Sequence, residues 1–67
     1  METILGSSGV IGKELAKALP KYTNKIRLVS RNPQKVNKDD VLFKANLFNA
    51  DETMKAVEGS EIVYLTV

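Results

Sequence analysis

The sequence predicts an α/β fold in which helices cover a parallel β-sheet. Short apolar segments rich in β-branched residues alternate with segments whose apolar residues repeat at helical spacing. Such alternation favours parallel strands joined by right-handed crossovers. Residues 62–67 form an almost uninterrupted apolar run, which is typical of a strand buried on both faces of a sheet.

The first half of the chain predicts a strand, a helix and a second strand. We expect strands over residues 2–5 and 26–29, and a helix over residues 10–19 that ends at Pro20, because the residue before a proline disfavours helical backbone. Only a short helical turn is expected after Pro33. The apolar residues expected to face the sheet from the helix are Ile11, Leu15, Ala18 and Leu19.

The second half predicts a strand, a helix and a final strand. A strand is expected over residues 41–43, and a strand over residues 62–67 closes the chain. Asn49 is a candidate N-cap for the helix between them, with Glu52 at the spacing of a capping box. Gly59 is the expected stop of that helix. The apolar residues expected in the core are Phe43, Ala50, Met54 and Val57.

Length and composition exclude several classes of protein. The chain has 67 residues, fewer than the roughly 100–150 of a usual domain, so at most one domain fits. With no Cys and no His, it contains no disulfide framework, Cys/His zinc site, Cys nucleophile or His base. The net charge is only +2 and acidic residues are interleaved with basic ones, so no nucleic-acid partner is expected.

Location and association are predicted from the apolar segments. No stretch approaches the roughly 20 apolar residues of a membrane span, and residues 1–12 do not form a secretory signal. We therefore expect a cytoplasmic protein without a membrane partner. An apolar strand at the end of the chain exposes an edge. We expect the native polypeptide to continue beyond it, or copies to associate through it as a homo-oligomer.

Three glycines at the spacing GxxGxxG lie between the first strand and the first helix. The first lets the chain turn sharply, the second lets the backbone approach a pyrophosphate, and the third lets the helix pack closely on the strands. The helix then directs its unpaired N–H groups at the phosphates. The candidate residues are Gly6, Ser7, Ser8, Gly9, Val10, Ile11 and Gly12. The alternative is a flexible turn with a structural role only.

This segment, residues 5–12, resembles the first turn of the extended and atypical short-chain dehydrogenase/reductase families, which include NAD(P)-dependent epimerases, dehydratases and reductases. The resemblance covers essentially the whole chain. It implies that residues 1–67 are the N-terminal part of a dinucleotide-binding domain: a truncated three-layer, parallel-sheet Rossmann fold with strand order 3-2-1-4. This half would bind the ADP part of a nicotinamide cofactor.

The resemblance also implies a small-molecule substrate that exchanges hydride with the cofactor in the full-length protein. No catalytic residue is expected on this chain. Tyr64 has no Lys four residues later, as the catalytic pair of these families would require, and we interpret it as a packing residue. Two alternatives stay open: a non-catalytic nucleotide-sensing module, and a small self-associating domain with a structural glycine loop.

The end of the second strand bears on the choice of cofactor. Enzymes that prefer NAD place an acidic residue here for the ribose 2′-hydroxyl, whereas this chain has Ser30 and Arg31. In similar proteins such a pair holds the 2′-phosphate of NADP, and a guanidinium suits a phosphate. NADP is therefore favoured and NAD is the alternative. Lys35 could assist, and Arg31 could instead be a solvated surface residue.

Two later segments complete the predicted site. The family often has Asp followed by Leu or Val after the third strand, and the Asp accepts a hydrogen bond from the adenine amino group. This chain has Asn46 and Leu47 there, and the Asn46 carbonyl can still accept. Thr66, with Val67, is expected near the adenosine. The alternatives are a plain turn for Asn46 and strand core for Thr66.

Overall fold

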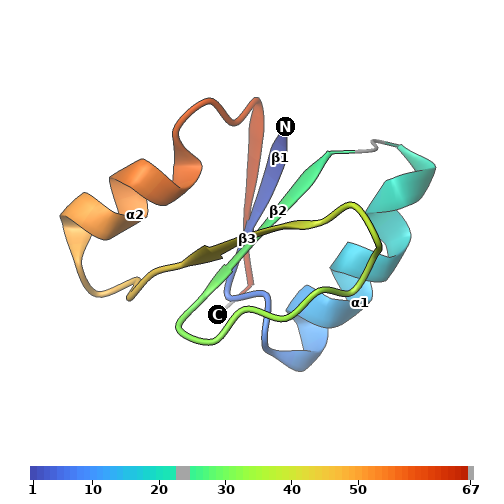
Figure 1. The fold of residues 1–67 in the computed structure, drawn as a ribbon, viewed down its shortest axis with the longest axis horizontal. Helices are drawn as coiled ribbons and strands as arrows, with labels where there is room; N and C mark the ends of the chain where they lie inside the picture. The colour runs from blue at the N-terminus through green and yellow to red at the C-terminus, as the bar shows by residue number, and fades with distance from the viewer. Residues whose placement is uncertain (23–24, 67) are drawn as a thin grey trace.

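Strands and helices alternate along the chain, as the sequence predicts (Figure 1). The computed structural model describes residues 1–22 and 25–66. Their elements are β1 (Glu2–Leu5), α1 (Val10–Ala18), η1 (a 3-10 helix, Leu19–Lys21), β2 (Ile26–Ser30), β3 (Val41–Lys44), α2 (Ala50–Val57) and β4 (Ile62–Leu65). The four strands are parallel and lie in the order β3-β2-β1-β4. This arrangement confirms the predicted fold class and strand order.

The parallel register brings the carboxyl ends of all four strands to one edge of the sheet. Leu5, the last residue of β1, is paired with Val29 on one side and Leu65 on the other. Val29 is in turn paired with Phe43 on β3. The segments that follow β1, β2, β3 and β4 therefore converge at this edge, which is where ligands bind in open α/β sheets.

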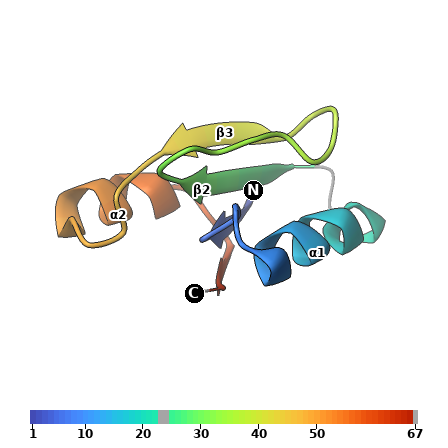
Figure 2. The ribbon, with the colours of Figure 1, turned by 90° about the horizontal axis from the view of Figure 1, so that it is seen from below.

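The two helices cover opposite faces of the sheet and make three layers (Figures 1 and 2). On the α1 face, Ile4 and Leu28 pack with Ala16 in one buried cluster. On the α2 face, the next residues along the same strands, Leu5 and Val29, join a second buried cluster. Successive side chains of a strand point to opposite faces, so one central strand pair supplies both cores.

The side of α1 that faces the sheet differs from the prediction. Gly12 and Ala16 are its buried residues, and Leu15 is only partly buried. Ile11 is 70% exposed and Ala18 is exposed too, so the prediction was wrong for both. The physical reason is close approach: glycine and alanine allow the helix axis to lie near the strands, and this sets the face instead of the larger apolar side chains. The α-helix ends at Ala18, and Leu19 continues into the 3-10 helix as a buried residue.

Helix α2 also turns a different face to the sheet. Its buried residue is Ala56, and Val57 packs beside it. Met54 is 69% exposed and Ala50 is exposed, so neither belongs to the core as predicted. Phe43 does pack against the second cluster.

The ends of α2 follow the sequence signals. The Asn49 side chain accepts a hydrogen bond from Glu52 N–H at 3.1 Å, which confirms the N-cap. The reciprocal half of the capping box is absent from the described structure. The Glu52 carboxylate accepts from Asn46 N–H instead, at 3.0 Å. Gly59 has a positive φ of 76°, the left-handed conformation expected of a residue that ends a helix.

Strand β4 is an edge strand with exposed apolar side chains. Ile62, Val63 and Leu65 are 48%, 42% and 66% exposed, which contradicts the prediction of a strand buried on both faces. The sheet pairs β4 with β1 alone, and neither described helix covers it. The strand ends at Leu65, and Val67 lies outside the described residues.

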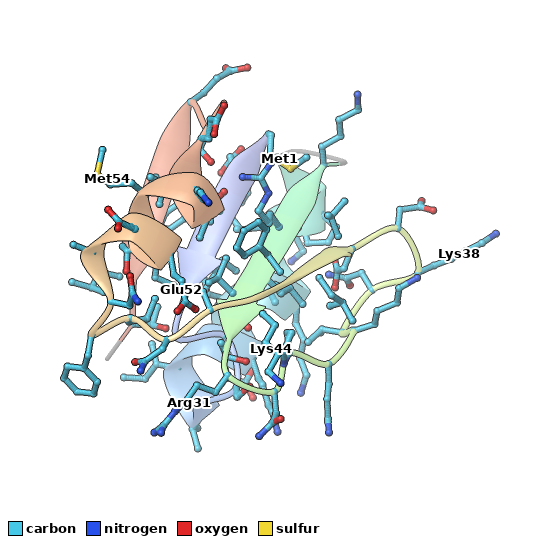
Figure 3. All side chains as sticks on the ribbon, turned by 60° about the vertical axis from the view of Figure 1, so that its left-hand side comes forward. Met1, Arg31, Lys38, Lys44, Glu52 and Met54 are labelled. Carbon is cyan, nitrogen blue, oxygen red and sulfur yellow. The ribbon has the colours of Figure 1, made fainter. Side chains whose placement is uncertain are left out.

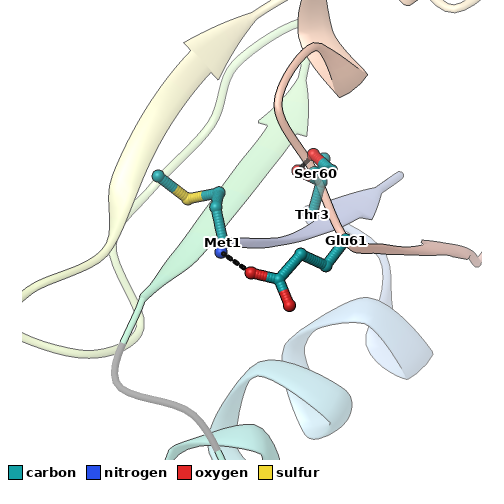
Figure 4. Close-up of polar contacts among 4 residues, drawn as sticks. All are labelled: Met1, Thr3, Ser60 and Glu61. Carbon is teal, nitrogen blue, oxygen red and sulfur yellow. Dashed lines mark hydrogen bonds and ion pairs between the residues drawn. The ribbon is translucent and has the colours of Figure 1, made fainter.

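The start of β4 is attached to the start of the chain (Figure 4). The Met1 ammonium lies 3.8 Å from the Glu61 carboxylate, and Glu61 N–H donates to the Met1 carbonyl. The buried Thr3 hydroxyl shares a hydrogen bond with the Ser60 hydroxyl. These contacts hold the start of β4 beside the start of β1, at the ends of the strands that lie opposite the convergent loops.

Two further expectations concern the remaining segments. The described residues between Pro33 and Asp40 form no helix, but they include one hydrogen-bonded turn in which Asp40 N–H donates to the Asn37 carbonyl at 3.2 Å. The buried Asp40 carboxylate accepts from Asn37 N–H at 2.6 Å, and Asn37 Nδ2 donates to the Ala16 carbonyl at 2.7 Å. Pro20 cannot donate to that carbonyl, so Asn37 satisfies it.

No helix within residues 1–22 and 25–66 is long and apolar enough to cross a membrane.

Candidate functional site: the glycine loop and its two cavities

The loop after β1 is fixed by backbone geometry. Gly6 has a positive φ of 85°, which suits glycine, and the N–H groups of Gly6 and Ser7 both donate to the Val29 carbonyl. A Cβ on Gly12 would lie 2.6 Å from the Gly6 carbonyl oxygen and 2.8 Å from the Ser7 Cα. Internal packing therefore requires glycine at the first and third positions of the motif.

Gly9 differs from these two glycines. Its backbone is extended, with φ −77°, and the nearest atom to a Cβ built there is the Gly6 carbonyl oxygen at 3.6 Å. A Cβ at this position would make an ordinary van der Waals contact only. Packing within the described residues therefore does not require glycine at position 9.

Gly9 is also the N-cap of α1, and no side chain in the described part of the chain caps the helix there. The N–H groups of the first helical turn have no partner within a helix, and the helix dipole makes this end positive. Val10 and Ile11 contribute these backbone groups, while their side chains extend into solvent. The arrangement can bind an anion through backbone donors.

The two serines of the loop have different roles. Ser7 is only 3% exposed, and its hydroxyl has no hydrogen-bond partner among the described residues. The Ser8 hydroxyl shares a hydrogen bond of 2.6 Å with the Ser30 hydroxyl and donates to the Asn32 carbonyl at 3.2 Å. Ser8 thus joins the glycine loop to the end of β2, whereas the Ser7 hydroxyl is buried without such a contact.

Two cavities flank the glycine loop. The smaller, of about 220 Å³, is lined by Ser7, Ser8, Lys13, Asn32 and Gln34. The larger, of about 440 Å³, is lined by Gly6, Ser30, Arg31, Ala45, Asn46, Leu47, Phe48 and Leu65. Five of the predicted site residues, from three separate loops, therefore line the larger cavity. Arg31 extends outward from the end of β2 (Figure 3).

Five of the predicted site residues line neither of these two cavities: Gly9, Val10, Ile11, Gly12 and Thr66. The Thr66 hydroxyl donates to the carbonyls of Leu5 and Gly6 at 2.9 and 3.1 Å, so the Thr66 side chain attaches the end of β4 to the glycine loop. Lys35 donates to the Lys38 carbonyl at 3.4 Å and lines neither of the two cavities. Asn46 is exposed, and its Oδ1 accepts from Phe48 N–H at 3.0 Å.

Sequence reasoning missed several lining residues. Lys13 and Gln34 line the smaller cavity, and their only signal was closeness in sequence to the glycine motif and to Arg31. Ala45, Phe48 and Leu65 line the larger one. Nothing in the sequence separates these three from ordinary core positions.

Tyr64 is a packing residue and lines neither of the two cavities. It packs against the first buried cluster, as interpreted from the sequence, and its hydroxyl donates to a Glu2 carboxylate oxygen at 3.0 Å. This hydrogen bond, together with burial and the negative charge of Glu2, raises the pKa of the Tyr64 phenol above its ordinary value of 10.0. Among the described residues no group of three or more acidic, His or Cys side chains could hold a metal ion.

Comparison with known proteins gives one match. The model of a protein family described as the NAD dependent epimerase/dehydratase family matches residues 3–67. No curated protein and no solved structure matches the chain significantly. The match begins within β1 and includes the glycine loop and every element after it.

Proposed function

Because this chain belongs to the NAD-dependent epimerase/dehydratase family, we propose that it binds the ADP part of NADP at the glycine loop, in preference to NAD. The pyrophosphate would lie against Gly9 and the first turn of α1. One observation carries this proposal: packing requires glycine at Gly6 and Gly12 but not at Gly9, where the lack of a side chain leaves the backbone open to a ligand.

The unpaired Ser7 hydroxyl supports a phosphate at the same place. A buried hydroxyl without a partner costs free energy, and Ser7 lines the smaller cavity beside the loop. A phosphate oxygen would accept its hydrogen bond. Lys13, in the same cavity, would add positive charge.

The preference for NADP follows from charge. Neither of the two cavities is lined by a carboxylate from the described residues, so no acidic group would hold the 2′-hydroxyl of NAD. Arg31 lines the larger cavity, beside the buried Ser30. A guanidinium forms bidentate, charge-assisted hydrogen bonds to phosphate, and the 2′-phosphate would be its partner.

The adenine would occupy the larger cavity. Its walls include the apolar side chains of Ala45, Leu47 and Leu65. A carbonyl oxygen has two lone pairs, so Asn46 Oδ1 keeps one for the adenine amino group beside its bond from Phe48 N–H.

In the whole protein, the nicotinamide would exchange hydride with a small-molecule substrate, and these residues would position the cofactor for that chemistry. Further polypeptide, or a second copy of the chain, would cover the exposed apolar side chains of β4. A cytoplasmic location and the absence of a nucleic-acid partner stay predictions.

The test is a pair of titrations with NADPH and NADH on the wild type and on Arg31→Gln. We expect the variant to lose roughly tenfold in NADPH affinity, about 1.4 kcal/mol, with NADH affinity unchanged. Lys38→Gln is the matched control, because Lys38 is exposed and lines neither cavity. Equal losses for both cofactors would refute the 2′-phosphate role, and a wild type that binds neither would refute nucleotide binding.

A further inference from the structure

Phe48 is the most exposed of the large apolar residues described, with 94% of its surface accessible. It lines the larger cavity together with Leu47 and Leu65. A single exposed apolar residue is ordinary in a soluble protein. An exposed aromatic ring at the rim of an apolar cavity is a different case, because it adds a flat hydrophobic wall.

The backbone around Phe48 is held by several hydrogen bonds. Phe48 N–H donates to Asn46 Oδ1 at 3.0 Å, and Asn49 N–H donates to the Asn46 carbonyl at 2.9 Å. The Glu52 carboxylate accepts from Asn46 N–H, and the Thr53 hydroxyl donates to the Leu47 carbonyl at 3.3 Å. The loop is therefore ordered on both sides of Phe48.

Ordering this loop does not depend on the ring itself. All of these hydrogen bonds use backbone groups or neighbouring polar side chains, and the ring is absent from both buried clusters. The fold thus fixes the backbone at a residue whose aromatic side chain gains no burial from the fold. An exposed ring at such a position is available to a flat apolar ligand.

We propose, on the basis of the function proposed above, that Phe48 stacks on the adenine ring of the bound dinucleotide. Adenine presents a flat π-face, and stacking of a base on an aromatic side chain tolerates an exposed position. The apolar residues Ala45, Leu47 and Leu65 form other parts of the cavity lining. Phe48 is then a positioning residue for the adenosine end of the cofactor.

The first experiment uses Phe48→Trp in the full chain. The sequence contains no Trp, so the new indole is the only tryptophan fluorophore, and a stacked adenine is expected to quench it. We expect quenching by 2′,5′-ADP, which carries adenine without the nicotinamide, and none by nicotinamide mononucleotide, which lacks adenine. The control is Tyr22→Trp, at a residue that is 82% exposed, follows η1 and lines neither cavity; its emission should not respond.

The second experiment measures affinity. Phe48→Ala should weaken NADPH and 2′,5′-ADP roughly tenfold, Phe48→Tyr should retain binding, and the thermal midpoint should not change because the ring is exposed. If the wild type binds NADPH but Phe48→Ala binds it equally and Phe48→Trp is not quenched, the stacking role is refuted and nucleotide binding stands. If Phe48→Ala only lowers self-association in sedimentation, the ring is an interface residue and this inference is overturned. A wild type that does not bind NADPH overturns both proposals.

Discussion

The two loops that approach the larger cavity from β1 and β3 are ordered by different means. Residues 6–9 after β1 pack so closely on α1 that a Cβ at Gly12 would lie 2.6 Å from the Gly6 carbonyl oxygen, and backbone hydrogen bonds to Val29 and a hydrogen bond from Thr66 also hold them. Residues 45–49 after β3 are fixed by side-chain hydrogen bonds from Asn46, Asn49 and Glu52. The structure has no space for a side chain at Gly6 or Gly12, whereas a Cβ at Gly9 would meet no clash. The second loop leaves the Phe48 side chain exposed. Close backbone packing thus constrains the first loop, and side-chain hydrogen bonds constrain the second.

Gly12→Ala should have the largest effect on stability. It tests how far close backbone packing constrains the first loop. The added methyl group would contact the Gly6 carbonyl and the Ser7 Cα, which are backbone atoms and cannot rotate away. Overpacking of this kind costs about 3 kcal/mol, a large part of the stability of a small domain. We expect loss of the cooperative transition in chemical denaturation followed by circular dichroism.

Gly9→Ala is the matched control for that variant. Its Cβ would meet no atom of the described chain closer than 3.6 Å, and alanine reduces the entropy of the unfolded chain. The free energy of unfolding should change by less than about 1 kcal/mol, while NADPH affinity falls at least several-fold. Equal destabilisation by both variants would show that Gly9 is structural and would remove the main support for the phosphate site.

The same contrast explains what could be predicted from the sequence. The glycine motif was recognisable because few residue types can satisfy its geometry, and β1 and the N-cap Asn49 follow equally local rules. The buried faces of the helices were not predictable in detail. Small residues such as Ala16 and Ala56, which carry little hydrophobic signal, are the fully buried ones, whereas Ile11 and Met54 extend into solvent.

Site residues show the same limit. Arg31 and Asn46 were found because they follow strands at family positions, and the structure brings both to one cavity. Phe48 was missed because its importance depends on exposure, which the sequence does not encode locally. The exposure of the β4 side chains depends on which elements pack beside the strand. A run of hydrophobic residues in the sequence does not indicate which elements those are.

Ser7→Ala should have a smaller effect, with opposite signs for stability and binding. The buried hydroxyl has no hydrogen-bond partner within residues 1–22 and 25–66, so its removal should leave the free energy of unfolding unchanged or raise it by up to about 1 kcal/mol. NADPH affinity should fall several-fold, because a phosphate loses a donor. Calorimetric melting and NADPH titration of the same sample measure both. A Ser7→Ala protein that is less stable would indicate a structural hydrogen bond for this hydroxyl.

The smallest effect on stability is expected for Tyr64, whose hydroxyl connects β4 to β1. A variant at Tyr64 tests whether the order of the first loop depends on β4. The pKa of its phenol is raised above 10.0 by the hydrogen bond to Glu2. A group whose folded pKa lies above its unfolded pKa contributes stability that is present below the unfolded value and is lost as pH rises through the folded one. Stability should therefore decline above about pH 10, and Tyr64→Phe should lack this part of the decline.

The free energy of unfolding of the wild type and of Tyr64→Phe, measured between pH 8 and 11, gives the contribution of this phenol. Tyr22→Phe is the control at an exposed tyrosine. Thr66 follows β4 directly and donates to the Leu5 and Gly6 carbonyls, so loosening of β4 should reach the glycine loop first. Hydrogen exchange at high pH should then speed up at Gly6 and Ser7 before it does at Asn46 and Phe48. Simultaneous loss of protection in both loops would mean that they open as one unit, in spite of the different contacts that order them.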